Sequence, residues 1–224
     1  MLKGVAGVLG AGAVATGGAL AYKGLSKPTT HSVKDLLSIK NPEKRLISKS
    51  LGGSSEEWKA AWKLYALDYK NNDKNPFSLT TEKPTTDPDG KQEAPSEFID
   101  KCVSLSGGQV VDEKDNSYQD VLKYCTRATL IKDLISENHP NRKILSNTGS
   151  EDAEGWKAAW SRYKQRNPQP KAQNNDEWKL SDWATHNTDD APNGLKTKCG
   201  EKIKLEIFDT NHKDYKDTVD WCTN

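Results

Sequence analysis

The chain has 224 residues, of which 33% are hydrophobic and 29% are charged, and its formal net charge is +1. Acidic and basic residues are interleaved along its length, which excludes the basic patch of a nucleic-acid-binding protein, so we expect no nucleic-acid partner. The low mean hydropathy of −0.87 predicts small cores, and such cores gain little net stability from burial alone.

The N-terminal segment 4–22 carries no charge and is rich in glycine and alanine. An uncharged stretch of about 20 residues is long enough to span a bilayer as a helix. We therefore expect residues 1–28 to be a transmembrane anchor or signal segment, with 4–22 in contact with the membrane. Two alternatives are a secretory signal cleaved near Ala19-Leu20-Ala21 and a buried Gly/Ala helix.

The rest of the chain repeats itself. Three segments recur at offsets of 98, 98 and 97 residues: 33–38 at 131–136, 58–62 at 156–160, and 118–125 at 215–222. This duplication predicts two tandem homologous helical units of about 95 residues each, a common domain size. Their expected bounds are 29–128 and 129–224.

A tryptophan-bearing helix is the strongest element expected in each unit. Ser54-Ser-Glu-Glu57 is a capping box, and the aromatic residues after it recur at helical spacing from Trp58 to Tyr69. The second copy starts at Trp156 and ends before Pro168. We interpret these tryptophans as core residues, with an exposed ligand platform as the alternative.

A polar segment follows each tryptophan helix. Residues 71–94 contain few apolar side chains and predict a long loop without order of its own. The counterpart, 167–196, also carries Trp178 and Trp183, which predict a short plug packed back on the helix. Because these two residues lie outside the repeated pattern, we expect them to be the more exposed pair and the candidate ligand contact.

Each unit closes with a cysteine-bearing module. A short helix is expected over 95–102, an alternating, strand-like stretch over 204–208, and a final helix from Ser117 in the first unit. Residues 117–139 contain no glycine or proline, so we expect that last helix to run on into the second unit. The expected fold class is thus mainly α with minor β.

The four cysteines form two equivalent pairs, Cys102 with Cys125 and Cys199 with Cys222. Their wide spacing is unlike the close pairs of zinc sites, so we expect no metal and predict one disulfide in each unit. A loop of this length gains about 3 kcal/mol from such a bond. A four-cysteine zinc site joining the units, or buried free thiols, are the alternatives.

Catalytic patterns are missing from the sequence. The four histidines are scattered singly and form no catalytic pattern with Ser or Cys, and Gly52-Gly53 and Gly107-Gly108 lack the Lys-Ser/Thr of a phosphate loop. Asp87-Pro-Asp-Gly90 is too short for a calcium loop. We expect no enzyme activity and no cofactor.

The general layout resembles that of the paralogous membrane and surface proteins of haemotropic mycoplasmas. The resemblance lies in the leader that begins Met-Leu-Lys-Gly-Val-Ala-Gly, the body rich in Lys, Asn and Asp, and a cysteine near the C-terminus, Cys222. It implies a membrane-associated or surface-exposed protein and carries no functional residue with it.

The compartment follows from two opposing signals. Lys23, Lys27 and Lys34 after the leader favour a cytoplasmic body, whereas paired cysteines favour the other side, and we give the cysteines more weight. The predicted function is a membrane-anchored, extracytoplasmic interaction or antigenic module with a protein or glycan partner outside the cell. The alternative is a cleaved, secreted protein that binds peptide or glycan.

Overall fold

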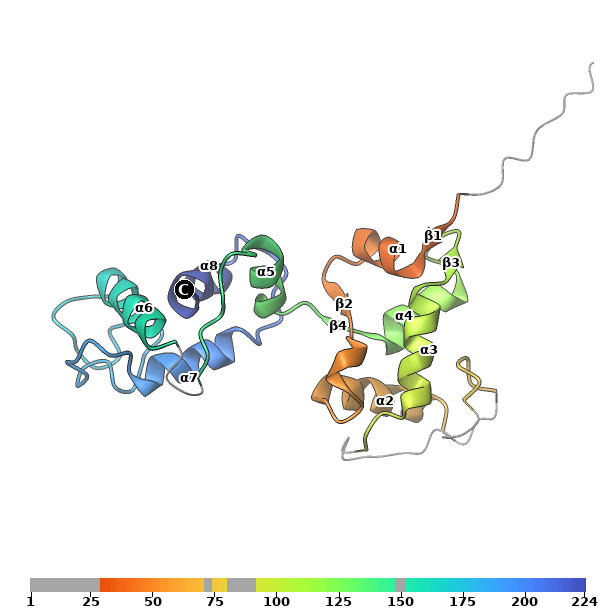
Figure 1. Ribbon diagram of the computed structural model, residues 1–224, viewed down its shortest axis with the longest axis horizontal. Coiled ribbons are helices and arrows are strands. Elements are labelled where there is room, and N and C mark those ends of the chain that lie inside the picture. Colours follow the sequence, from red (N-terminus) through yellow and green to blue (C-terminus); the bar gives the residue numbers. More distant parts are fainter. Residues whose placement is uncertain (1–28, 71–73, 80–91, 148–151) are drawn as a thin grey trace, which may run out of the picture.

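A computed structural model describes residues 29–70, 74–79, 92–147 and 152–224. The predicted anchor or signal at 4–22 lies outside this range. The described part is mainly helical with two small sheets, which confirms the expectation of a mainly α fold with minor β. Its elements form two groups, joined after β4 by a short stretch of chain (Figure 1). We refer to residues 29–128 as the first half and to 129–224 as the second half.

The first half contains four helices and four short strands in the described ranges. In chain order these are β1 (His31–Ser32), α1 (Val33–Lys40), β2 (Lys44–Leu46), the 3-10 turn η1 (Lys49–Leu51), α2 (Glu56–Asp68), α3 (Ser96–Ser106), β3 (Gln109–Val110), α4 (Asn116–Tyr124) and β4 (Thr126–Ala128). Strand β1 pairs antiparallel with β3, and β2 pairs antiparallel with β4.

The second half repeats the helices. They are α5 (Ile131–Asn138), α6 (Ala153–Arg166), α7 (Asn193–Lys202) and α8 (Lys213–Cys222). Isolated antiparallel bridges stand where the first half has its sheets: Leu130 faces Glu206, and Ile144 faces Thr223. These bridges join the positions that correspond to β1–β3 and β2–β4.

Hydrogen bonds match between the halves as closely as the elements do. The bond from Val33 N–H to Gly108 O (2.9 Å) in the first half matches the bond from Ile131 N–H to Leu205 O (3.0 Å) in the second. Likewise, the bond from Ile47 N–H to Cys125 O (3.0 Å) matches the bond from Leu145 N–H to Cys222 O (2.9 Å). The indole N–H of Trp58 bonds to Ser48 O at 2.9 Å, and that of Trp156 bonds to Ser146 O at 2.8 Å. The repeated sequence therefore specifies a repeated local structure.

The tryptophan helices bury the predicted stripe. Helix α2 is capped by Ser55, whose hydroxyl accepts from Trp58 N–H, one residue after the Ser54 that the predicted capping box implies. Trp62 and Tyr65 have no exposed surface. In α6, Trp160 and Tyr163 are equally buried. The core interpretation of these tryptophans is confirmed.

One expectation about the junction is wrong. Helix α4 ends at Tyr124, and the chain passes through β4 before α5 begins at Ile131, so no continuous helix joins the halves. The absence of glycine and proline did not keep the helix going, because Cys125 is tied to Cys102 and the following residues pair with β2.

Two arginines fix the halves at that junction. Arg45 of β2 makes a two-pronged contact with Glu137 of α5, with both N···O distances at 2.8 Å. Arg127 of β4 does the same with Asp133, at 2.6 and 2.9 Å. Paired N–H···O bonds of this kind fix direction as well as distance.

Both predicted disulfides are present. Cys102 is bonded to Cys125 and Cys199 to Cys222, each with its Cα atoms 5.5 Å apart, and neither pair leaves a free thiol. The zinc and free-thiol alternatives are thereby removed. Disulfides persist in oxidising compartments, so they indicate an extracytoplasmic or secreted protein. None of the helices in the described ranges is both apolar and long enough for a bilayer crossing.

Candidate interaction surfaces

A buried tyrosine organises the turn that follows each tryptophan helix. The Tyr65 hydroxyl donates to Asn75 Oδ1 at 2.5 Å and accepts from Phe77 N–H at 3.1 Å. The same Asn75 oxygen accepts from Leu79 N–H at 3.1 Å. Ser78 adopts a left-handed φ of 52° to close the turn.

The second half builds the same turn with a carboxylate. The Tyr163 hydroxyl donates to Asp176 Oδ2 at 2.5 Å and accepts from Trp178 N–H at 3.0 Å. The same Asp176 oxygen accepts from Leu180 N–H at 2.9 Å, and Lys179 closes the turn with a left-handed φ of 51°. Burial raises the pKa of both tyrosine hydroxyls above its ordinary value, so each keeps the proton that it donates.

This turn was missed in the sequence. The expected long loop at 71–94 contains Phe77 and Leu79 in its described part, and both are buried. The shared signal is a polar residue, an aromatic residue two places later and a leucine two places after that. It occurs as Asn75-Pro-Phe-Ser-Leu79 and Asp176-Glu-Trp-Lys-Leu180, at an offset of 101 residues instead of 98.

The structure also corrects the expected exposure of Trp178 and Trp183. Their exposed fractions are 7% and 0%, so both side chains are buried, although 7% is the largest exposed fraction among the seven tryptophans. Trp183 stands edge-on to Trp160 with ring centroids 5.7 Å apart, and its indole N–H donates to Asn175. The predicted plug that packs back on the helix is present, and because it is buried it offers no open face to a peptide or a sugar ring.

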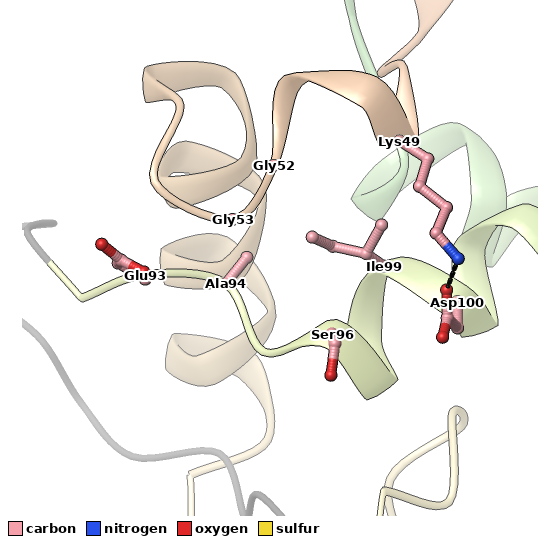
Figure 2. A pocket seen from close by; sticks show the side chains of 8 residues that line it. All are labelled: Lys49, Gly52, Gly53, Glu93, Ala94, Ser96, Ile99 and Asp100. Carbon is pink, nitrogen blue, oxygen red and sulfur yellow. Dashed lines mark hydrogen bonds and ion pairs between the residues drawn. The ribbon is translucent and has the colours of Figure 1, made fainter.

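A shallow hollow lies on the first half between η1 and the start of α3. It encloses about 380 Å³, with Gly53 and Ala94 at one end and the ion pair of Lys49 and Asp100, 2.5 Å apart, at the other (Figure 2). A Cβ on Gly53 would lie 2.1 Å from Ala94 O, so glycine is required for this close approach. The hollow holds one exposed ion pair and the Ser96 hydroxyl, with no histidine or cysteine in its lining, and we assign it no chemistry.

A larger groove lies where the halves meet. It encloses about 600 Å³, and we name it the junction groove. One wall is α2, through Ala60, Ala61 and Leu64. The opposite wall consists of β4 and the residues on either side of it, and Lys204 and Glu206 of the second half complete the rim.

Metal clusters and free thiols are both absent from the described residues. No group of three or more His, Cys, Asp or Glu side chains comes together in them as a metal site. All four cysteines are in disulfides, so no thiol is available as a nucleophile. The structural features that remain for function are surfaces and the junction groove.

Comparisons with known proteins add no family. No family model matches the chain, and neither the search of curated proteins nor the search of solved structures returned a match. The function proposed for this chain therefore follows from its own sequence and structure.

Proposed function

We propose that the chain is a membrane-anchored, surface-exposed interaction protein built from two tandem homologous units, 29–128 and 129–224. Residues 4–22 attach it to the membrane, and the body faces the outside of the cell, where its partner is another protein. It performs no catalysis, and the disulfide in each unit stabilises a small core.

The observation that carries this proposal is that the two halves share the same helices but differ in their exposed apolar side chains. Among the described residues, six of the seven large hydrophobic side chains that are exposed lie in the first half: Ile39, Leu51, Leu64, Leu67, Val103 and Val111. The second half has Glu137, Arg162, Gln165 and Gly200 at four of the matching positions. Since the second half folds without these apolar residues, the frame does not require them, and exposed apolar surface favours a contact with a partner.

Cell-surface exposure is the first test. Intact cells that produce the protein are treated with an external protease, and a cytoplasmic protein of the same cells serves as the control. We expect the body to be degraded while the control stays intact. N-terminal sequencing then distinguishes a retained anchor, which begins at the start of the chain, from a leader cleaved after residue 21.

Thiol labelling tests the compartment independently. The native protein is alkylated before and after reduction, and its mass is measured. We expect no labelled cysteine before reduction and four after it. Four labelled cysteines in the native protein, or a body that external protease does not reach, would overturn the extracytoplasmic assignment.

A further inference from the structure

The junction groove contains an open strand edge. Cys125 and Thr129 of the β4 segment are bonded to β2 through Ile47 N–H to Cys125 O at 3.0 Å and Thr129 N–H to Glu43 O at 2.8 Å. Because alternate residues of a strand face opposite sides, the main-chain groups of Thr126 and Ala128 point away from β2. Both residues line the groove, and β4 has no second strand beside it among the described residues. The Ala128 carbonyl accepts from the Arg127 guanidinium at 2.9 Å, which leaves the Thr126 carbonyl as the open acceptor of this edge.

The second half shows which chemistry fits this edge. There the Arg162 guanidinium donates to Thr223 O at 2.6 Å and to Asp220 O at 2.7 Å. In the first half the matching carbonyls belong to Thr126 and Lys123. Neither of them accepts a hydrogen bond from the described residues, because Leu64 occupies the position of Arg162.

Charge decides between two kinds of donor. Arg162 lies 3.6 Å from the Asp220 carboxylate, which favours a cation at that place. The first half has Lys123 at the position of Asp220, and Lys123 is itself paired with Asp68 at 2.7 Å, so the carboxylate that faces Arg162 has no counterpart beside Leu64. A neutral amide N–H satisfies the same carbonyls without a carboxylate partner, and Ala60 and Leu64 offer apolar contact beside them.

We propose that the junction groove binds an extended peptide segment of a partner protein, which adds to the free edge of β4 as a third strand. Its main-chain N–H groups bond to the Thr126 carbonyl on this edge and to the Lys123 carbonyl at the end of α4, and an apolar side chain packs on Leu64. Main-chain pairing supplies the affinity, and the groove wall selects the side chains. This inference rests on the proposed function and names the site of that interaction.

The probe is a phage-displayed library of random linear peptides, panned on the full disulfide-bonded chain. The central variant is Leu64→Arg, which places at the edge the side chain that covers it in the second half. We expect the enriched peptides to bind this variant at least ten-fold more weakly. The matched control is Gln165→Leu, which adds an exposed leucine to α6 at the position of Leu67, outside the groove, and should leave binding unchanged.

Two further readouts separate strand addition from nonspecific apolar contact. N-methylation of alternate peptide amides should abolish binding in one register and spare it in the other. Hydrogen exchange of the Ala128 amide should slow when peptide is present. Circular dichroism and the unfolding midpoint of Leu64→Arg confirm that the variant is folded.

Three outcomes would overturn the inference: no enrichment on the wild-type chain over Leu64→Arg, equal binding of the selected peptides to both, or binding that survives N-methylation in both registers. Each of them leaves the cell-surface protease and thiol results untouched. A failure of the groove is therefore distinguishable from a failure of the proposed function.

Discussion

The two halves hold the same helix pair together with opposite charges. In the first half, Asp68 of α2 meets Lys123 of α4 at 2.7 Å. In the second half, Arg166 of α6 meets Asp220 of α8 at 3.0 Å. The positions are equivalent, and the signs are exchanged.

The neighbouring aromatic residue changes together with the charges. Tyr124 donates its hydroxyl to the Asp68 carboxylate at 2.8 Å, whereas the Arg166 guanidinium lies 4.9 Å from the centre of the Trp221 ring. A carboxylate accepts from a phenol, and a cation is attracted to an indole face. The same packing of two helices is therefore compatible with either order of the charges, provided that the neighbouring aromatic residue is a tyrosine beside the carboxylate or a tryptophan beside the arginine.

The largest expected effect comes from the buried tryptophans. Trp62→Ala and Trp160→Ala should each lower the free energy of unfolding by about 3–5 kcal/mol, because each empties a fully buried site. The two halves should differ for Trp→Phe. Trp160 donates its indole N–H to Thr188 O at 3.1 Å, whereas the indole N–H of Trp62 is buried without a partner among the described residues. Urea unfolding should therefore show Trp160→Phe to be costlier by about 1 kcal/mol, and equal costs would contradict it.

The disulfides come next. Cys102→Ala with Cys125→Ala, and separately Cys199→Ala with Cys222→Ala, should each cost about 3 kcal/mol, since both bonds close loops of the same length. Chemical denaturation of the two double variants measures this. A large difference between the two double variants would show that the two disulfides do not contribute equally to the stability of the fold.

The charge reversal can be transplanted. Lys123→Asp places a second carboxylate against Asp68 and should cost about 1 kcal/mol, a small value because the wild-type ion pair is partly exposed. Adding Asp68→Arg should restore part of this stability, and adding Tyr124→Trp should restore more. If the triple variant is no more stable than the double variant, the coupling to the aromatic residue is wrong.

The smallest expected effect is a pH dependence at the junction. Burial works against the charged form of Asp133, but Arg127 and the Leu130 N–H hold the pKa of Asp133 below its ordinary value. A lowered pKa gives stability that is present above the unfolded value of about 4 and is lost as the pH falls through the folded value. Asp133→Asn should therefore weaken the acid dependence of unfolding below pH 4, as measured by urea titrations at several pH values.

The sequence predicted those parts of the fold that depend on local pattern. The buried stripe from Trp58 to Tyr65 and the pairing of the cysteines follow from spacing that repeats along the chain, and the start of the tryptophan helix was predicted to within one residue. Where the two copies keep the same offset, the expectation and the structure agree.

The parts that failed depend on partners far apart in sequence. The end of α4 is set by Cys102 and β2, which no count of glycine and proline reveals. The turn at Asn75 was hidden because an insertion moved its counterpart to Asp176, and the burial of Trp183 depends on Asn175 and Trp160. The open edge of β4 depends on a contact that only the structure shows, because Arg162 bonds to the Thr223 carbonyl in the second half and Leu64 stands at its position in the first.

The short connection between the halves has a mechanical consequence. The chain leaves β4 at Ala128 and enters the next bridge at Leu130, and the single residue between them, Thr129, is itself bonded to Glu43. Tension applied along the chain therefore reaches the second half without any slack to take up. Force applied to the two ends of the described chain would pass from one half to the other through this connection, so neither half would move independently of the other.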